Sequence, residues 1–191
     1  RRLRPAAHGG LEAGEGEVRL GAAQHRPRQL EASGFAFGGS CLPKDLRATA
    51  YLAKSRDIEV PMLASILASN RNHLELAFDR IVALNKRKIG FVGLSFKTGT
   101  DDLRESPLVT LAELLIGKGY ELRIYDPEVH LARLLGANKS FIERHLPHIG
   151  QMLEPELDGV VDASEVLVLG SASPVVLEAL AARIRPDQQL V

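Results

Sequence analysis

Residues 88–125 read KIGFVGLSFKTGTDDLRESPLVTLAELLIGKGYELRIY, and this stretch decides the fold class. It opens with a short apolar strand, 88–94, and Ser106-Pro107 is typical of a helix start, with serine at the N-cap and proline in the first turn. The apolar residues that follow recur at helical spacing as far as Lys118-Gly119, where the helix should end. Residues 120–125 alternate as a half-buried strand. The stretch therefore predicts a strand, a crossover helix and a second, parallel strand.

The rest of the C-terminal half continues this alternation. We expect a helix over 127–136, an apolar strand at 166–169, a helix over 174–183 and the beginning of a strand at 190–191. Strands and helices in this order predict an α/β fold, with a parallel sheet covered by helices. We interpret residues 85–191 as a Rossmann-like domain that is truncated at its end.

Two helices are expected ahead of this sheet. One helical pattern runs from Pro43 to about Lys54, and a longer one covers 61–84. The second is longer than a small sheet needs for cover, so we interpret it as a connector or a dimer-forming helix. The sequence thus predicts a helical central (dimerisation) domain over 34–84 and a homodimer or higher homo-oligomer.

Residues 1–33 differ in composition from the rest of the chain. They contain no aromatic residue, no Ile, Met, Lys or Asp, and much Arg, Ala and Gly, so little there could form a core. Four glutamates and one serine argue against a transit peptide. We expect an irregular, unmatched segment, and our hypothesis is that it arises from a shifted reading frame or a misplaced gene start.

Composition also limits the partners. Lys+Arg and Asp+Glu number 24 each, so the chain has no net field to hold a nucleic acid or an anionic membrane surface. No apolar stretch approaches the roughly 18–20 residues that cross a bilayer, and we expect a cytoplasmic protein. A single cysteine can form neither an intramolecular disulfide nor a cysteine-based zinc site. Cys41 is therefore either a packing residue or a reactive thiol.

The strongest chemical signal is GGSCLPKD at 38–45. Two glycines allow a ligand to approach the backbone, and Cys41 precedes a helix start, where free amides and the helix dipole favour a thiolate. Lys44 adds a cation, and Asp45 could orient a water molecule or take part in proton transfer. The alternative is a small buried cysteine beside an ordinary solvated helix start.

Two segments carry a family resemblance. GFAFGGSCLPKD at 34–45 resembles the signature of the UDP-glucose/GDP-mannose dehydrogenase family, and GLSFKTGTDDLRESP at 93–107 resembles its C-terminal domain loop. GKGYELRIYDPEV and GANKSFIERHLPHI, further on, resemble the branch that acts on GDP-mannose. The resemblance covers 34–191 and implies that the family's N-terminal NAD domain is absent from this chain. We therefore expect this chain on its own to be inactive.

The resemblance implies a mechanism and a set of contacts. Family enzymes oxidise the C6 alcohol of a nucleotide sugar to an acid with two NAD. Cys41 would form a thiohemiacetal and then a thioester, and Asp45 would assist the water or proton steps. The implied binding residues are Lys44 and Arg104 for NAD, and Phe35, Gly38 and Lys97 for the nucleotide sugar.

The residues alone leave other interpretations open. Arg104 could bind an anion or pair with Asp101 or Asp102. Asp126 is better explained as a cap for the next helix than as a ribose ligand. UDP-glucose could replace GDP-mannose as substrate, or the chain could be a non-catalytic binding and dimerisation module.

Two further chemistries are disfavoured. A cysteine hydrolase would need a histidine near Cys41, and His73 is the only candidate in the helical region. His145 and His148 form an H-x-x-H pair, but Pro147 disfavours a regular turn across them and no third ligand is evident. We therefore expect no metal site.

Overall fold

The computed structural model describes residues 35–129, 134–170 and 172–191, which all belong to one unit, Ala32–Val191. The segment 1–33 lies outside the described residues. The elements are α1 (Leu42–Lys54), α2 (Pro61–Ala83), β1 (Lys88–Val92), α3 (Pro107–Gly117), β2 (Glu121–Tyr125), α4 (Gly136–His145), α5 (Ile149–Met152), α6 (Leu157–Ala163), β3 (Val166–Leu169), α7 (Pro174–Ala181) and β4 (Gln189–Leu190).

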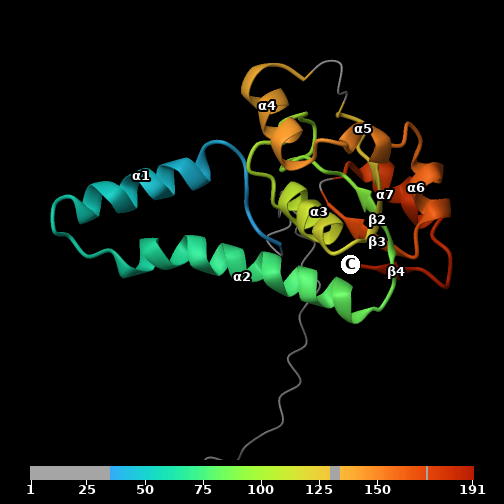
Figure 1. Ribbon diagram of the computed structural model, residues 1–191, viewed down its shortest axis with the longest axis horizontal. Coiled ribbons are helices and arrows are strands. Elements are labelled where there is room, and N and C mark those ends of the chain that lie inside the picture. The colour runs from blue at the N-terminus through green and yellow to red at the C-terminus, as the bar shows by residue number, and fades with distance from the viewer. Residues whose placement is uncertain (1–34, 130–133, 171) are drawn as a thin grey trace, which may run out of the picture. The chain divides into compact units, whose positions relative to one another are not determined.

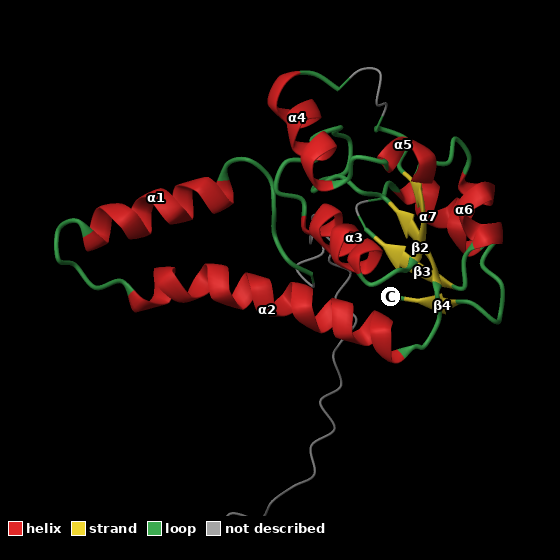
Figure 2. Cartoon of the chain, viewed as in Figure 1, coloured by secondary structure: helices red, strands yellow, loops and turns green. Residues whose placement is uncertain are grey.

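The four strands form one parallel sheet in the order β2-β1-β3-β4 (Figure 2). Ile89 of β1 pairs with Leu122 on one side and with Val166 on the other. The chain therefore passes from β1 to β2 and then crosses to the other side of β1 to reach β3. In open α/β sheets, ligands bind at the carboxyl ends of the strands where the strand order reverses in this way. The predicted parallel α/β fold is confirmed.

Helices cover both faces of the sheet. Side chains alternate along each strand, so the apolar residues of β1 point to both faces and both must be buried. Ile89 and Phe91 belong to one buried cluster together with apolar residues of α3, α4 and the end of α2. Val92 points to the opposite face, where it belongs to a second cluster with residues of α6 and α7. Figure 1 shows α3 on one side of the strands and α6 and α7 on the other.

The ends of α3 lie where the sequence places them. Gly119 has a φ of 78°, and Tyr120 N–H donates to the Leu115 carbonyl at 3.1 Å, which closes the helix with a Schellman motif. Ser106 occupies the N-cap position, but its hydroxyl does not cap the helix. It donates instead to the Leu94 carbonyl at 2.7 Å and so ties the start of α3 to the end of β1.

The predicted helix over 127–136 is wrong at both of its described ends. Pro127 and Glu128 form a turn, and residues 130–133 lie outside the described residues. Gly136, the expected end of a helix, begins α4 instead. The Asp126 carboxylate accepts a hydrogen bond from Glu128 N–H at 3.0 Å, as aspartate does in a turn.

The helices α1 and α2 run antiparallel to each other (Figure 1) and pack together. Both lie within about one residue of the predicted ranges. They expose several large apolar side chains, among them Tyr51 and Met62, each with 76% of its surface accessible. Neither these helices nor the others in the described part of the chain could span a membrane.

One buried hydroxyl predicts a stabilising substitution. Ser164 Oγ has no hydrogen-bond partner in the described structure, and it lies against Gly90 at the centre of the sheet. Ser164→Ala removes this unsatisfied group without adding volume, so we expect the free energy of unfolding to rise by about 1 kcal/mol. Urea denaturation of both proteins measures this difference. A less stable variant would show that the hydroxyl has a partner.

Candidate functional site

The glycine pair of the cysteine motif lies directly against the loop 93–107. A Cβ atom on Gly38 would stand 2.3 Å from the carbonyl oxygen of Glu105 and 2.6 Å from Cδ of Pro107. A Cβ atom on Gly39, whose φ is 86°, would lie 2.7 Å from the ring of Phe96. Packing within the chain therefore explains the two glycines, because a side chain at either position would push the cysteine motif away from the loop 93–107.

Asn70 of α2 holds the segment before the cysteine in place. Its Oδ1 accepts a hydrogen bond from Phe37 N–H at 2.7 Å, and its Nδ2 donates to the Phe37 carbonyl at 2.8 Å. An amide side chain can satisfy both groups of one peptide residue in this way. Sequence reasoning missed this clamp, although asparagine inside a long helix was a signal, since it is a poor helix former.

Removing the clamp should loosen the cysteine motif. In Asn70→Ala the two polar groups of Phe37 lose their partner, and we expect a loss of about 1–3 kcal/mol of stability. Hydrogen exchange at the Phe37 amide should accelerate. Asn72→Ala is the matched control, because Asn72 is exposed on the same helix and makes no side-chain hydrogen bond within the described residues. Equal exchange at Phe37 in the two variants would contradict the clamp.

Cys41 is exposed and occupies the N-cap position of α1. Its side chain does not cap the helix, and its sulfur lies 3.9 Å from Oγ of Ser40. The interpretation of Cys41 as a buried packing residue is therefore wrong. Cys41 thus presents its thiol to solvent at the N-terminus of α1.

Lys44 and Asp45 follow in the first turn of α1 and are both exposed. The Nζ atom of Lys44 lies 3.5 Å from Oδ1 of Asp45, and their side chains are 64% and 66% accessible. An ion pair this exposed contributes little to stability. Both groups are consequently available to a ligand.

The loop 93–107 is fixed from two directions. Oδ2 of buried Asp126 accepts hydrogen bonds from the amides of Leu94 and Ser95, at 2.8 and 3.0 Å. On the other side, Asn138 of α4 accepts from Leu103 N–H at 2.9 Å and donates to the Asp101 carbonyl at 2.8 Å. Asp126 is thus used within the chain, but the helix that it was expected to cap is replaced by the turn at Pro127 and Glu128.

Arg104 forms a two-point ion pair with Asp102. Its Nε and Nη2 atoms lie 2.9 and 2.7 Å from the two carboxylate oxygens. This hydrogen bonding raises the pKa of Arg104 and lowers that of Asp102, and the nearby Cys41 side chain raises the pKa of Arg104 further. Arg104 thus pairs with Asp102, as one interpretation expected, and its assignment to NAD stays a prediction.

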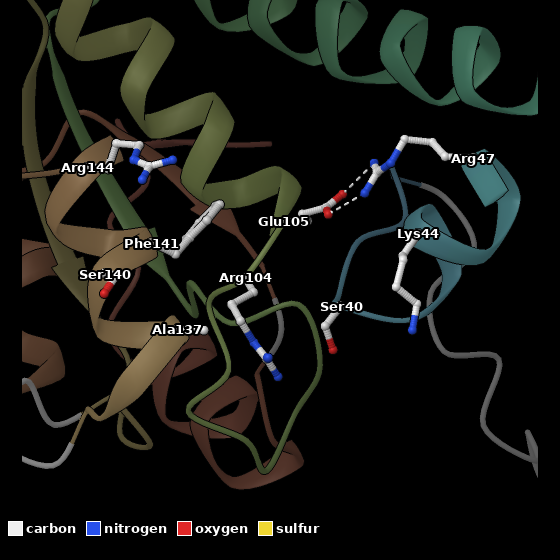
Figure 3. Close-up of a pocket in the computed structure, with 9 residues that line it drawn as sticks. All are labelled: Ser40, Lys44, Arg47, Arg104, Glu105, Ala137, Ser140, Phe141 and Arg144. Atoms are coloured by element: carbon white, nitrogen blue, oxygen red, sulfur yellow. Dashed lines mark hydrogen bonds and ion pairs between the residues drawn. The ribbon is translucent and has the colours of Figure 1, made fainter. Parts of the chain in front are cut away.

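A second ion pair joins α1 to the loop. The guanidinium of Arg47 donates to both carboxylate oxygens of Glu105, at 2.7 and 2.9 Å (Figure 3). Glu105 has a φ of 51°, a conformation that residues other than glycine rarely adopt. Neither residue was a sequence-based candidate, because nothing in the pattern indicates a left-handed glutamate or a contact across 58 positions.

These segments enclose an open pocket of about 390 Å³ together with α4 (Figure 3). Four basic side chains and one carboxylate lie among the residues that line it. The full lining is Ser40, Lys44, Arg47, Arg104, Glu105, Ala137, Ser140, Phe141 and Arg144. The two residues assigned to NAD by resemblance, Lys44 and Arg104, are thus brought together. The wall formed by α4 was not expected.

The residues assigned to the nucleotide sugar do not line this pocket. Phe35 is half-buried and packs against the main core, and Gly38 packs against Glu105 and Pro107. Lys97 is exposed in the loop, where its carbonyl accepts a hydrogen bond from Ser95 Oγ. Their assignment to the sugar stays a prediction.

His145 has a local role. Its Nδ1 atom lies 2.9 Å from Oε2 of Glu113, and its ring stacks on Phe141 with 4.4 Å between centroids. Across the described residues, no group of three or more His, Cys, Asp or Glu is arranged to hold a metal ion.

Two family models match the chain. One describes the UDP-glucose/GDP-mannose dehydrogenase family, central domain, and matches residues 12–72; the other describes the UDP binding domain of the same family and matches residues 90–177. The first match starts at residue 12 and so extends into the segment 1–33, for which the sequence alone suggested no resemblance. Together the two matches cover most of the chain.

Several relatives of this chain are GDP-mannose 6-dehydrogenases. That of Pseudomonas aeruginosa is 58% identical over 145 residues, which are 76% of this chain and 33% of the relative. That of Azotobacter vinelandii is 50% identical over 74% of this chain and 32% of the relative. The UDP-glucose 6-dehydrogenase of Rickettsia bellii is 30% identical over 72% and 31%. The chain spans about a third of the length of the curated relatives it matches.

Solved structures show the same relationship. The GDP-mannose dehydrogenase of Pseudomonas aeruginosa, in a ternary complex, superposes with a TM-score of 0.76 at 53% identity, over 85% of this chain and 37% of that one. The UDP-glucose dehydrogenase of Pyrobaculum islandicum gives a TM-score of 0.62 at 28% identity, over 75% and 32%. In sequence and in fold, the chain therefore belongs to the UDP-glucose/GDP-mannose dehydrogenase family.

Proposed function

We propose that this chain is the part of a GDP-mannose 6-dehydrogenase that carries the nucleophile. Residues 34–84 supply the cysteine and residues 85–191 form the nucleotide-sugar-binding domain. One observation carries the proposal: Cys41 is exposed at the start of α1, directly after Ser40, which lines the pocket together with Lys44 and Arg104. GDP-mannose is preferred over UDP-glucose because relatives with the first activity share 50–58% identity, against 30–34% for the second.

The thiol of Cys41 would act in the second half of a four-electron oxidation. After the C6 alcohol has become an aldehyde, Sγ adds to the carbonyl carbon and the carbonyl oxygen takes a proton, which gives a thiohemiacetal. Loss of a hydride from carbon and of the hydroxyl proton converts this adduct into a thioester. Sulfur suits both steps, because a thiolate attacks carbonyls readily and a thioester is readily hydrolysed.

Hydrolysis of the thioester would release GDP-mannuronate. Water adds to the acyl carbon, the carbon–sulfur bond breaks, and Sγ leaves as the thiolate that the helix N-terminus stabilises. The carboxylate of Asp45, one turn further along α1, accepts the proton from the water. Arg104 would balance negative charge at the sulfur.

The pocket fits an anionic dinucleotide. Lys44 and Arg104 supply cations within one open pocket, and the Phe141 ring offers an apolar surface between them and Arg144. When bound, NAD accepts the hydride in each of the two oxidations. Lys44 and Arg104 would hold it through its negative charge.

We also propose that the chain assembles as a homodimer or higher homo-oligomer through α1 and α2. These helices and the loop between them expose Tyr51, Leu52, Ile58, Met62 and Leu76, each with about half or more of its surface accessible. Apolar side chains gathered in this way are typical of a protein–protein interface.

Binding of the sugar nucleotide tests the proposal in the 191-residue chain itself. Calorimetric titration should show tighter binding of GDP-mannose than of UDP-glucose, and Lys97→Ala should weaken the binding of GDP-mannose roughly tenfold through loss of a charge-assisted contact. Lys118→Ala is the control, because Lys118 is exposed beyond the end of α3, ahead of β2. Preference for UDP-glucose would favour the second activity.

A non-catalytic binding and dimerisation module is the other candidate. It would share the binding behaviour and the oligomer but would not need a reactive thiol. Iodoacetamide labelling of Cys41 at neutral pH distinguishes the two, since a nucleophile should react faster than free cysteine. A rate no faster than free cysteine would favour the module.

A further inference from the structure

Glu105 occupies a backbone conformation that its residue type disfavours. Its φ of 51° lies in the left-handed region, which glycine adopts freely and other residues adopt only under strain. Among the described residues, the other non-glycine residues with a positive φ are Asp57 and Asn85, and both types tolerate this region because their short side chains bond locally. Glutamate lacks this compensation. Strained residues of this kind persist where the surrounding structure holds them, and they cluster at functional sites.

The Glu105 side chain is held by one partner in the described part of the chain. Both of its carboxylate oxygens accept a hydrogen bond from the guanidinium of Arg47, at 2.7 and 2.9 Å (Figure 3). The two side chains are 52% and 38% accessible, and an ion pair this exposed adds little to stability. Two parallel hydrogen bonds do, however, fix the orientation of one group relative to the other. The effect of the pair is therefore mainly on geometry.

The pair joins the two segments that carry the proposed cofactor contacts. Arg47 lies three residues after Lys44, on the same face of α1, and Glu105 follows Arg104 directly in the loop 93–107. All four side chains line the same pocket. The position of Lys44 relative to Arg104 therefore depends on the contact between Arg47 and Glu105.

The alternative is an ordinary surface ion pair. In that case glycine would serve better at position 105, because it would relieve the strained backbone and give up only an exposed contact. We propose instead that Glu105 is a positioning residue: through Arg47 it fixes the start of α1, with Cys41 and Lys44, relative to Arg104. This inference rests on the proposed function and adds to it a pair of residues that hold the two sides of the pocket in register.

Glu105→Gly separates positioning from stability. Glycine fits the backbone at this position, so the urea midpoint should stay the same or rise. The start of α1 should nevertheless move more freely. Nitroxide labels at Cys41, the single cysteine of the chain, and at Lys139→Cys on α4 report this movement through their dipolar coupling. We expect a broader distance distribution in Glu105→Gly than in the otherwise unchanged chain.

Two further variants make this comparison specific. Asn85→Gly also replaces a left-handed residue, with a φ of 53°, but lies between α2 and β1 and does not line the pocket, so its distance distribution should stay narrow. The exchange Arg47→Glu with Glu105→Arg keeps a side chain at the strained position and restores the ion pair in reverse. It should narrow the distribution again.

Binding is measured on the unlabelled chain by calorimetry with NAD and with inorganic pyrophosphate, which carries the same diphosphate group. Glu105→Gly should weaken both roughly fivefold, because the two sides of the pocket are no longer preorganised. An unchanged distance distribution in Glu105→Gly, or unchanged binding of both ligands, would overturn the positioning role. A wild-type chain that binds neither ligand would count against the proposed cofactor site, and the distance measurement would then decide on Glu105 by itself.

Discussion

Gly38→Ala is expected to separate the cysteine motif from the loop 93–107. The added methyl group would lie 2.3 Å from the Glu105 carbonyl oxygen, which belongs to the backbone and cannot rotate away as a side chain would. Overpacking of this kind commonly costs about 1–3 kcal/mol, and more where the obstacle is rigid. We expect a loss of at least about 2 kcal/mol of stability, measured by urea denaturation.

The same substitution should disturb the pocket, because Arg104 and Glu105 follow the displaced backbone. Binding of pyrophosphate should weaken together with stability. Gly117→Ala is the control: no atom lies within 4 Å of the added methyl, at the last residue of α3. Alanine is the better helix former, so this variant should match or exceed the wild type by up to about 1 kcal/mol. Equal behaviour of the two variants would refute the docking role of Gly38.

Cys41→Ser should stop the second oxidation in the complete enzyme and lower overall turnover by several orders of magnitude. Serine is nearly the same size and is favoured at an N-cap, so folding should be preserved. Its hydroxyl is a far weaker nucleophile than a thiolate at neutral pH, and an ester would be hydrolysed more slowly than a thioester. The loss therefore falls on chemistry.

Two measurements separate this effect from a loss of binding. Calorimetry with GDP-mannose should give the same affinity for Cys41→Ser and the wild type. NADH release under single-turnover conditions should fall from two equivalents per bound substrate toward one, since the first oxidation does not need the thiol. Continued formation of GDP-mannuronate by Cys41→Ser and by Cys41→Ala would remove Cys41 from the mechanism.

The sequence predicts the elements whose local signals agree with their tertiary contacts. Proline and glycine mark both ends of α3, and apolar alternation marks β2, so both were located within about a residue. The helices α4, α5 and α6 were missed. The helix α4 begins at Gly136, has no side-chain cap and buries only Ile142, so its stability comes from contacts that no local pattern records.

The site divides in the same way. A rare combination of residue types, such as glycines before Cys41, is visible in sequence. The partners that fix it come from distant positions: Asn70 lies 33 residues from Phe37, and Arg47 lies 58 from Glu105. Such pairs depend on how the helices cross, which propensity and spacing do not specify. The α4 wall of the pocket, with Phe141 and Arg144, was hidden for the same reason.

At the junction between Gly38 and the 105–107 segment, the atoms closest to Gly38 belong to the main chain of Glu105 and to the ring of Pro107. Such a junction should tolerate the exchange of one of its two sides for the corresponding part of another family member. A chimera that takes its cysteine-bearing helices from one family member and its sheet domain from another should assemble as long as the glycine is kept. Base and sugar preference could then be exchanged together with the sheet domain while Cys41 stays where it is.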